Sequence, residues 1–308
     1  MVINMYDVII IGLGPAGAAA AVYCQRAGIR SVVFEGFAPG GQVSTTDKIE
    51  NYPGFVSVEG YELAMKLADQ AKHCGAEIRY EQILSADLGG EIKRVSTAKG
   101  SYQARAAIIC GGAKRRTLGV AGEDRLVGRG LSYCAVCDGG FYRGKRVAVI
   151  GGGDTAVGDA VYLSRLCEKV YIIHRRDSFR AAKSKLRQLE ACANVEKIMG
   201  AVVDSFRLDA DGRINGIILK RGDSLVPLDC DGVFAAVGTV PDTSIYQGLE
   251  LDGNGYIITD ENMRTSLPNV FAAGDIRRKP VRQIVTAASD GAIAGISAAE
   301  AIEQLNNE

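Results

Sequence analysis

The feature that most constrains the fold is a glycine-rich motif that occurs twice, each time directly after a short apolar segment. The first copy is Gly12-Leu-Gly-Pro-Ala-Gly17, and it follows residues 6–11, which are rich in β-branched side chains. Such a segment predicts a strand buried on both faces of a parallel sheet. An alanine-rich stretch to Arg26 then predicts a helix, and residues 31–34 predict a second strand that ends at Glu35. This order of strand, glycine turn, helix, strand and acid is typical of a βαβ unit that binds a dinucleotide.

Each position of the first motif has a physical task. Gly12 allows the tight turn, Gly14 lets the backbone approach a pyrophosphate, and Gly17 lets the helix and strand pack closely. The helix N-terminus offers unpaired N–H groups and the positive end of its dipole to the phosphates. Glu35 is placed to accept hydrogen bonds from ribose hydroxyls and would repel a 2′-phosphate. We therefore expect a nucleotide site here, although a glycine turn in an ordinary βαβ unit is the alternative.

The second copy, Gly151-Gly-Gly-Asp-Thr-Ala156, repeats this plan. Residues 145–150 predict the strand before it, 157–166 the helix and 170–173 the next strand. The position of the acid is now occupied by His174-Arg175-Arg176, and Arg180 follows farther along the chain. Guanidinium groups pair with a 2′-phosphate in bidentate geometry, so the second site is expected to prefer NADP over NAD. A solvated basic cluster after a strand is the alternative.

Two sites with opposite 2′ preference predict two different dinucleotides. A flavin and a nicotinamide are the natural pair, because hydride passes from one to the other. The repetition also extends beyond the motifs, since residues 107–113 and 232–238 are apolar segments that end in glycine, each after one βαβ unit. The sequence therefore predicts an α/β protein with a duplicated fold, in which the second copy is inserted into the first.

Composition excludes several other classes of protein. A chain of 308 residues has room for about two domains at roughly 150 residues each, and 47% hydrophobic content excludes a disordered chain. Its 36 basic residues balance 36 acidic ones, which argues against a nucleic-acid-binding protein. The apolar residues 8–24 follow no Lys or Arg and contain helix breakers, so they predict neither a signal peptide nor a membrane span. We expect a cytoplasmic protein without a membrane partner.

Eight cysteines are too sparse for a disulfide-stapled secreted scaffold. Two of them form Cys134-Ala-Val-Cys137, which Asp138 follows directly. Structural zinc would need further ligands that the chain does not offer in a second CxxC or a His pair, so no metal is expected and the pair predicts a redox disulfide. Asp138 is placed to act as a general acid that protonates a departing thiolate, or to cap a helix. The six single cysteines are expected mostly to be small buried hydrophobes: Cys24, Cys74, Cys110, Cys167, Cys192 and Cys230.

Taken together, these motifs resemble those of the low-molecular-weight thioredoxin reductases. The resemblance runs essentially from end to end and includes GLGPAG at 12–17, GGQ at 40–42, ENYPGF at 50–55, CAVCDG at 134–139, GGGDTA at 151–156, HRRDSFR at 174–180, AAGD at 272–275 and RQIVTAASDG at 282–291. It implies two Rossmann-like dinucleotide-binding domains, each a three-layer ββα arrangement. Residues 1–115 and 246–308 would form an FAD domain, and residues 116–245 an inserted NADPH domain that carries the cysteine pair. It also implies a homodimer.

The resemblance assigns residues of this chain to each cofactor. Those implied to contact FAD are Gly12, Gly14, Pro15, Ala16, Gly17, Glu35, Gly41, Gln42, Asn51, Gly274, Asp275, Arg282, Gln283 and Ile284. Those implied to contact NADPH are Gly151, Gly153, Asp154, Thr155, Ala156, His174, Arg175, Arg176 and Arg180. Asp275 would bind the ribitol-phosphate part of FAD, and residues 282–291 would open a helix beside the flavin ring.

The resemblance also implies a reaction sequence with thioredoxin as the protein substrate. NADPH would reduce FAD, FAD would reduce the disulfide through the flavin-proximal Cys137, and Cys134 would attack thioredoxin. The cysteine pair and the NADPH turn share one domain yet must both reach the flavin, so a domain rotation about residues 114–119 and 240–244 would alternate them. The alternatives are a reductase of another thioredoxin-like or peroxiredoxin carrier, a ferredoxin-dependent flavin thioredoxin reductase, and a flavin-binding regulatory protein that senses redox state.

Two segments call for separate expectations. Many members of the family carry two aromatic residues after CxxCDG, a region to which partner docking is partly attributed, whereas this chain has Gly140-Phe-Tyr142. The basic stretch Ile276-Arg-Arg-Lys279 is expected to be a solvated surface loop, with a contact for an acidic partner as the alternative.

Overall fold

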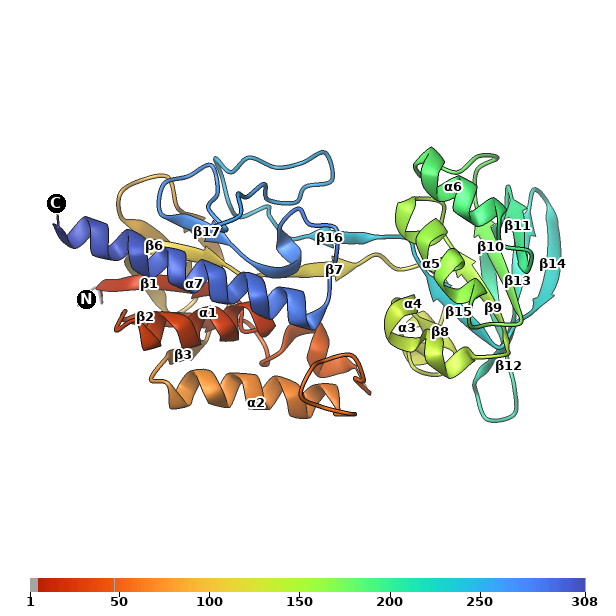
Figure 1. The fold of residues 1–308 in the computed structure, drawn as a ribbon, viewed down its shortest axis with the longest axis horizontal. Coiled ribbons are helices and arrows are strands. Elements are labelled where there is room, and N and C mark those ends of the chain that lie inside the picture. Colours follow the sequence, from red (N-terminus) through yellow and green to blue (C-terminus); the bar gives the residue numbers. More distant parts are fainter. Residues whose placement is uncertain (1–4, 47, 308) are drawn as a thin grey trace. The chain divides into compact units, whose positions relative to one another are not determined.

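The computed structural model describes residues 5–46 and 48–307, and this part of the chain divides into two units (Figure 1). The first unit holds the described residues up to Lys114 together with those from Val240 onward, and the second is Arg115–Thr239. The second unit is therefore inserted in the sequence of the first. Strands β7 (Ala113–Arg115) and β16 (Thr239–Pro241) pair with each other where the chain passes between the units.

Residues 240–245 belong to the first unit, although the sequence analysis assigned them to the inserted domain. Lys114 Nζ lies 3.0 Å from Asp242 Oδ2, and Thr243 Oγ1 donates a hydrogen bond of 3.1 Å to the Gly255 carbonyl. These contacts within the first unit hold the segment there.

The first unit contains a seven-stranded sheet within the described residues, in the order β3-β2-β1-β6-β5-β4, with β17 also paired to β6. Its strands are β1 (Met5–Ile11), β2 (Ser31–Glu35), β3 (Glu77–Tyr80), β4 (Ser85–Asp87), β5 (Lys93–Thr97), β6 (Gly100–Ile109) and β17 (Val270–Ala272). Its helices are α1 (Pro15–Arg26), α2 (Gly60–His73) and α7 (Ile284–Asn307), with short 3₁₀ turns η1 (Gly41–Thr45) and η3 (Gly274–Ile276). The strands β3, β2, β1, β6 and β17 are parallel.

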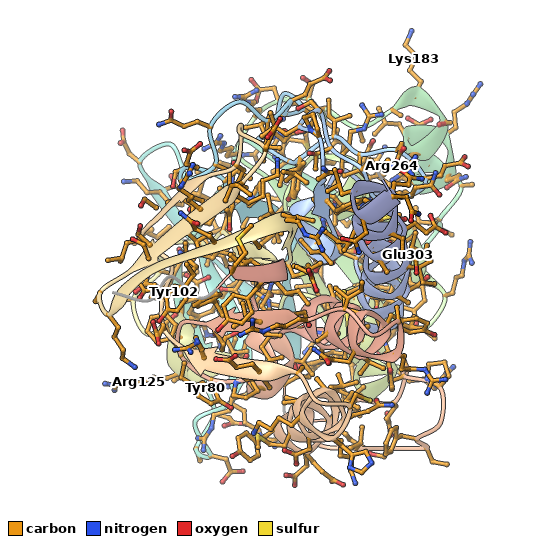
Figure 2. The ribbon with its side chains drawn as sticks, turned by 90° about the vertical axis from the view of Figure 1, so that its left-hand side faces the viewer. Tyr80, Tyr102, Arg125, Lys183, Arg264 and Glu303 are labelled. Atoms are coloured by element: carbon orange, nitrogen blue, oxygen red, sulfur yellow. A yellow bond between two sulfur atoms is a disulfide. The ribbon has the colours of Figure 1, made fainter. Side chains whose placement is uncertain are left out.

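Successive side chains of β1 point to opposite faces of this sheet and contribute to two hydrophobic cores, one on each face. Val8 and Ile10 belong to a buried cluster that includes residues of α1 and α7, whereas Ile9 and Ile11 pack on the opposite face with Tyr102. Figure 2 shows Tyr102 and Glu303 of α7 on opposite sides of the sheet. One face is therefore covered by helices and the other by β-rich segments, so this sheet has the layers of the predicted ββα arrangement.

The second unit repeats this plan with a five-stranded parallel sheet in the order β11-β10-β9-β15-β8. Its strands are β8 (Leu131–Ser132), β9 (Arg146–Ile150), β10 (Lys169–His174), β11 (Val195–Met199), β12 (Val202–Leu208), β13 (Ile214–Arg221), β14 (Ser224–Asp229) and β15 (Gly232–Ala235). Its helices are α3 (Glu123–Leu126), α4 (Ala135–Asp138), α5 (Asp154–Ser164) and α6 (Lys183–Glu190), with the 3₁₀ turn η2 (Gly139–Tyr142). Helix α5 packs on one face, and the antiparallel sheet β12-β13-β14 packs on the other.

The predicted elements are present, and their ends differ most where glycine follows a strand. The apolar segments 107–113 and 232–238 stop being strand at Ile109 and Ala235. Gly112 and Gly238 then adopt positive φ angles of 66° and 97°, which turn the chain away from the sheet.

The two long predicted helices also shift at their ends. Helix α5 begins at Asp154 rather than 157, because the glycine turn itself leads into the first helical residue, and α7 begins at Ile284. Across residues 5–46 and 48–307, we find no helix with the length and apolar character needed to cross a membrane.

Candidate functional site

The first glycine turn joins β1 to α1 with almost no room for side chains. Gly12 has a φ of +102°, and a Cβ there would lie 2.5 Å from the Cys110 carbonyl oxygen. A Cβ on Gly17 would lie 1.8 Å from the Gly12 carbonyl oxygen. At Gly14, by contrast, the nearest atom to an added Cβ is 3.9 Å away. The turn is therefore closed toward the protein and open on the face where a pyrophosphate would approach.

Helix α1 starts at this turn without a capping side chain. Its N-cap is Gly14, Pro15 follows, and the first turn contains no acidic residue. The first-turn N–H groups therefore remain available to an anion, which the helix dipole also favours.

Glu35 at the end of β2 is bound to the same turn. One carboxylate oxygen accepts a hydrogen bond of 2.9 Å from the Leu13 N–H, and the other accepts one of 3.1 Å from Phe37 N–H. A carboxylate has further lone pairs, so these bonds leave acceptor capacity for ribose hydroxyls.

The second glycine turn, between β9 and α5, has the same construction. A Cβ on Gly151 would lie 2.4 Å from the Ala236 carbonyl oxygen, whereas one on Gly153 would have no heavy atom within 4 Å. Gly153 is the N-cap of α5 and makes no side-chain cap. Asp154 follows it, and its carboxylate accepts a hydrogen bond of 2.7 Å from Ala182 N–H. The second turn thus also presents uncapped N–H groups.

The basic residues after β10 divide into two environments. Arg175, Arg176 and Arg180 are exposed, and the Arg180 N–H donates a 2.7 Å hydrogen bond to the Gly152 carbonyl. This bond ties the arginine loop to the glycine turn. The guanidinium groups are therefore available to a phosphate beside the turn.

His174, in contrast, is 5% exposed and stacks on Phe179 with ring centroids 5.8 Å apart. Burial lowers its pKa, and the neighbouring arginines lower it further. The neutral ring lies against Gly152, where a Cβ would be 2.3 Å from the imidazole. Sequence reasoning did not single out Gly152, and it grouped His174 with the phosphate-binding arginines, whereas the structure places the ring against the turn.

Residues from both chain ends meet within the first unit. The Asn51 side-chain amide donates a hydrogen bond of 3.1 Å to the Gln283 side-chain oxygen. The Gln42 side-chain amide donates to the Ala113 carbonyl at the end of the first segment. The structure therefore brings together Asn51 and Gln283, two residues that the resemblance assigned to FAD and that lie far apart in the sequence.

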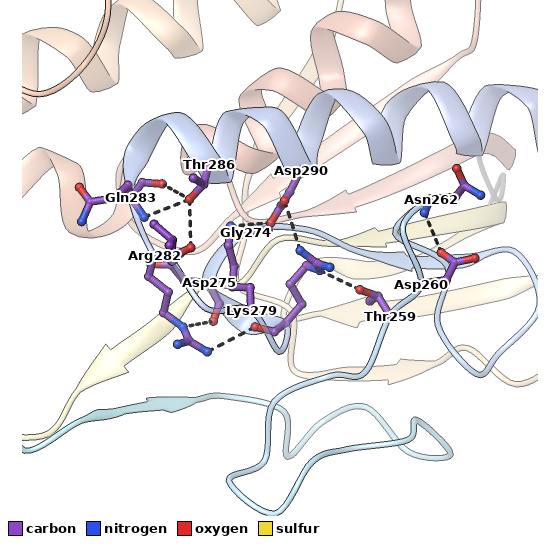
Figure 3. Close-up of polar contacts among 12 residues, drawn as sticks. Thr259, Asp260, Asn262, Gly274, Asp275, Lys279, Arg282, Gln283, Thr286 and Asp290 are labelled. Carbon is purple, nitrogen blue, oxygen red and sulfur yellow. Dashed lines mark hydrogen bonds and ion pairs between the residues drawn. The ribbon is translucent and has the colours of Figure 1, made fainter. Parts of the chain in front are cut away.

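Asp275 lies in η3 and carries an unsatisfied buried atom. Among the described residues, none donates a hydrogen bond to its buried Oδ1. Burial raises the pKa of this carboxyl, against the opposing influence of Lys279 and Arg282. Arg282 Nε lies 3.5 Å from the Asp275 carbonyl (Figure 3). The Arg282 guanidinium carbon lies 4.0 Å from the centre of the Tyr256 ring. A buried acceptor without a donor fits a ligand hydroxyl.

Asp290, a buried acid on α7, forms hydrogen bonds with residues 274–279, the segment that contains Asp275. Its carboxylate accepts hydrogen bonds from Gly274 N–H at 3.1 Å and Lys279 Nζ at 2.7 Å (Figure 3), and from Arg277 at 3.3 Å. Sequence reasoning missed its role. The available signal was an acid inside an otherwise apolar helix, which predicts a buried partner.

The expectation of a solvated loop at residues 276–279 is wrong. Ile276 is fully buried, and the Lys279 side chain is only 5% exposed because it pairs with Asp290. Arg277 pairs with the same carboxylate, and Arg278 is the exposed residue of the stretch.

The cysteine pair forms a disulfide between Cys134 and Cys137 in the second unit. Cys134 is the N-cap of α4, and its sulfur accepts a hydrogen bond of 3.1 Å from Cys137 N–H.

The six single cysteines are buried or partly buried. Buried are Cys24, Cys110, Cys167 and Cys230, and partly buried are Cys74 and Cys192. Burial raises the pKa of Cys167 to about 11 and that of Cys24 to about 12, so these thiols are not thiolates at neutral pH.

Comparison with known proteins decides the family. Residues 6–291 match the model of the pyridine nucleotide-disulphide oxidoreductases. The chain belongs to this family. It is 46% identical to the thioredoxin reductase of Listeria monocytogenes over 98% of this chain and 95% of that protein. The crystal structure of the thioredoxin reductase from Streptococcus pyogenes matches with a TM-score of 0.90 and 42% identity, over 97% of this chain and 99% of that one. The thioredoxin reductase from Giardia duodenalis matches with a TM-score of 0.92 and 35% identity, over 97% and 99%.

These relatives confirm the resemblance found in the motifs and the predicted fold class of two Rossmann-like dinucleotide-binding domains. Thioredoxin reductases of the pyridine nucleotide-disulphide oxidoreductase family use FAD and NADPH. The residues present fit both groups. The orphaned Asp275 oxygen and the uncapped N-terminus of α1 suit FAD, and the second uncapped turn with its exposed arginines suits NADPH.

Asp290→Asn is expected to weaken FAD retention by this oxidoreductase. The substitution leaves Lys279 buried without its carboxylate, and breaking a buried pair in this way costs about 3–5 kcal/mol. Flavin absorbance relative to protein absorbance after gel filtration measures the retained FAD. Glu303→Gln, which neutralises an exposed carboxylate on the same helix, is the matched control. Full flavin content and native stability in Asp290→Asn would show that the Asp290 carboxylate does not stabilise this segment.

Asp159 on α5 predicts a pH-dependent stability. Burial raises its pKa to about 7, although Lys185 opposes the shift. The native state therefore holds this proton more tightly than the unfolded chain, and stability is lost as pH rises from about 4 to about 7. We expect Asp159→Asn to raise the free energy of unfolding by about 2 kcal/mol at pH 8 and to leave it unchanged at pH 4. Partial exposure of the side chain to solvent keeps this effect small. Urea unfolding at both pH values tests this prediction, and Asp211→Asn, at an exposed aspartate, is the control. Equal free energies of unfolding for Asp159→Asn and the wild-type protein at pH 8 would refute it.

Proposed function

We propose that the chain is an NADPH-dependent thioredoxin reductase. NADPH reduces bound FAD, the Cys134–Cys137 disulfide is reduced in turn, and the resulting dithiol reduces the disulfide of thioredoxin. The observation that carries the proposal is a CxxC disulfide in the same unit as an uncapped glycine turn flanked by exposed arginines. Such a unit pairs a site for the electron donor with a group that accepts two electrons.

The residues of the first unit have binding roles in this proposal. The α1 N-terminus holds the pyrophosphate of FAD, Glu35 accepts from ribose hydroxyls, and Asp275 accepts from the ribitol-phosphate part. The remaining contacts come from the turns and helix starts assigned above: Gly41, Gln42, Asn51, Arg282, Gln283 and Ile284. When bound, FAD supplies two-electron transfer between the nicotinamide and the disulfide.

The residues of the second unit bind the electron donor and transfer its electrons onward. Arg175, Arg176 and Arg180 hold the 2′-phosphate of NADPH, and Gly151 to Ala156 hold its pyrophosphate. Cys137 is the sulfur nearer the flavin and Cys134 is the one that attacks thioredoxin. Asp138 protonates the thiolate that departs when a sulfur–sulfur bond breaks.

The proposal includes a domain rotation about the paired strands β7 and β16. The NADPH turn and the cysteine pair belong to one unit and must each reach the flavin of the other, so rotation presents them in turn. It also includes a homodimer that works in the cytoplasm and binds thioredoxin near the redox motif. Phe141 is exposed there, whereas position 140 is glycine.

The alternatives make different demands on the motifs. A ferredoxin-dependent relative would have degraded nicotinamide motifs, whereas GGGDTA and HRRDSFR are intact here. A reductase of a peroxiredoxin or another thioredoxin-like carrier would differ only in its partner. A regulatory flavoprotein would not turn over NADPH rapidly with a disulfide partner.

Replacing Arg175 and Arg176 together by alanine is expected to raise the KM for NADPH about 100-fold while sparing activity with NADH. Each charge-assisted hydrogen bond to the 2′-phosphate contributes about 1.5–3 kcal/mol, and NADH lacks that phosphate. Steady-state rates with thioredoxin measure both. Arg187→Ala, at an exposed arginine of the same unit, should leave both values unchanged. If the native protein prefers NADH, the assignment of NADPH as the electron donor is wrong.

Cys134→Ser is expected to abolish thioredoxin reduction and to leave flavin reduction by NADPH measurable. The nucleophile is lost, but both nucleotide sites are intact. Anaerobic bleaching of flavin absorbance follows the first half-reaction, and reduced thioredoxin reports the second. Cys192→Ser, at a partly buried cysteine of the same unit, should retain both. Loss of both activities in folded Cys134→Ser would show that the half-reactions do not separate as proposed.

A further inference from the structure

Ser132 occupies a fixed position directly before the redox motif. It ends strand β8, which pairs in parallel with β15 so that Ser132 registers with Phe234. Its partner Phe234 is 1% exposed and packs in the core of the second unit, and Ser132 itself is 3% exposed. Strand pairing and burial together fix the location of its hydroxyl group. A hydroxyl held on a strand in this way is a rigid reference point for the loop that follows.

The Ser132 hydroxyl joins the two ends of the redox motif. Its oxygen accepts a hydrogen bond of 3.0 Å from the Cys134 N–H, and it lies 2.6 Å from Asp138 Oδ2, to which it donates. One proton and two lone pairs allow both bonds at once, although the Cys134 carbonyl at 3.4 Å is a weaker acceptor for the same proton. At 2.6 Å the contact between the two oxygens is a short hydrogen bond. Ser132 therefore holds Asp138 through a contact outside its own helix.

The capping role considered for Asp138 is not what the structure shows. Asp138 ends the four-residue helix α4, and at the start of η2 it makes no side-chain cap hydrogen bond. Its carboxylate points instead to Ser132. The side-chain contact that the structure gives Asp138 is therefore with Ser132 and not with a helix end.

Other charged or titratable groups also face Asp138. The partly buried guanidinium of Arg115 interacts electrostatically with it, and this guanidinium lies over the Tyr133 ring, 5.2 Å from the ring centre. Burial, and then the charge of Asp138, raises the pKa of Tyr142 to about 12, so this phenol is neutral at physiological pH.

Glu123 fixes the residue between Ser132 and Cys134. It accepts hydrogen bonds from the Tyr133 hydroxyl and from the Leu118 and Gly119 N–H groups, the latter at 2.7 and 2.9 Å. Both Ser132 and its neighbour are thus held, and the Asp138 carboxyl has a defined place.

We propose that Ser132 is a positioning residue for the proton transfer that accompanies reduction of the cysteine pair. Its hydroxyl holds the Asp138 carboxyl in place and stabilises the carboxylate that remains after the proton has left. The inference rests on the proposed function, which assigns the acid role to Asp138. Reduction of the disulfide by NADPH breaks the S–S bond, oxidises NADPH to NADP⁺ and yields two thiols. NADPH supplies two electrons and one proton as hydride, and the second proton comes from water through Asp138, which solvent reprotonates.

The test follows thiol formation in the FAD-loaded protein after mixing with NADPH, as a function of pH and without any partner protein. Ser132→Ala is expected to form thiols about tenfold more slowly on the low-pH plateau, because the acid is no longer held in position. The rate falls at high pH as Asp138 loses its proton. In Ser132→Ala this fall should move about one pH unit higher, because the carboxylate has lost a hydrogen-bond donor. Bleaching of the flavin by NADPH should be unchanged.

Three further variants separate positioning from packing. Ser132→Thr keeps the hydroxyl and should retain most of the rate and the wild-type pH profile. Ser205→Ala, on β12, is the matched control because Ser205 also donates a hydrogen bond to a carboxylate, that of Asp204 at 3.1 Å. It should change neither the rate of thiol formation nor its pH profile. Ser132→Ala combined with Asp138→Asn should be no slower than Asp138→Asn alone, because both act on one step.

Three results would overturn the inference while leaving the proposed function intact. These are a wild-type pH profile in Ser132→Ala, a Ser132→Thr variant as slow as Ser132→Ala, and losses that multiply in the double variant. If NADPH generates no thiols at the cysteine pair of the native protein at any pH, the proposed function and the inference both fail.

Discussion

The structure depends on two turns in which the backbone passes too close to other atoms to admit a side chain. A Cβ on Gly17 would lie 1.8 Å from the Gly12 carbonyl oxygen, and one on Gly151 would lie 2.4 Å from that of Ala236. These close approaches bring α1 and α5 directly onto the carboxyl ends of parallel strands. Each helix then begins without a capping side chain, so its first N–H groups are left for a phosphate. Both proposed nucleotide sites depend on this one constraint.

What distinguishes the two sites is the chemistry at the end of the next strand. Glu35 is held against the first turn by hydrogen bonds to backbone N–H groups, which suits a ribose and excludes a 2′-phosphate. Arg175 and Arg176 occupy the corresponding place in the second unit and are exposed. The same unit carries the Cys134–Cys137 disulfide. The proposed site for the electron donor and the disulfide thus lie in the same unit.

The sequence predicted the βαβ units because their signals are local: apolar period, glycine spacing and the residue type after each strand. It failed where a partner lies on another element. Asp290 bonds to Gly274 N–H, and its pairing with Lys279 made the prediction of a solvated loop wrong. His174 belonged by spacing to the basic cluster, but its ring fills the space that the absent Cβ of Gly152 leaves. The roles of Ser132 and Glu123 also depend on side-chain directions that no local pattern encodes.

The central claim is that electrons from NADPH reach one cysteine pair through bound FAD. The most direct measurement is to add NADPH or NADH at equal low concentration to the anaerobic FAD-loaded protein, alkylate the new thiols and map them by mass spectrometry. Our account predicts that NADPH makes Cys134 and Cys137 newly alkylated, that NADH does so far less, and that protein stripped of FAD does not respond. Labelling that does not change at these two residues, or that changes equally with NADH or without FAD, would contradict it.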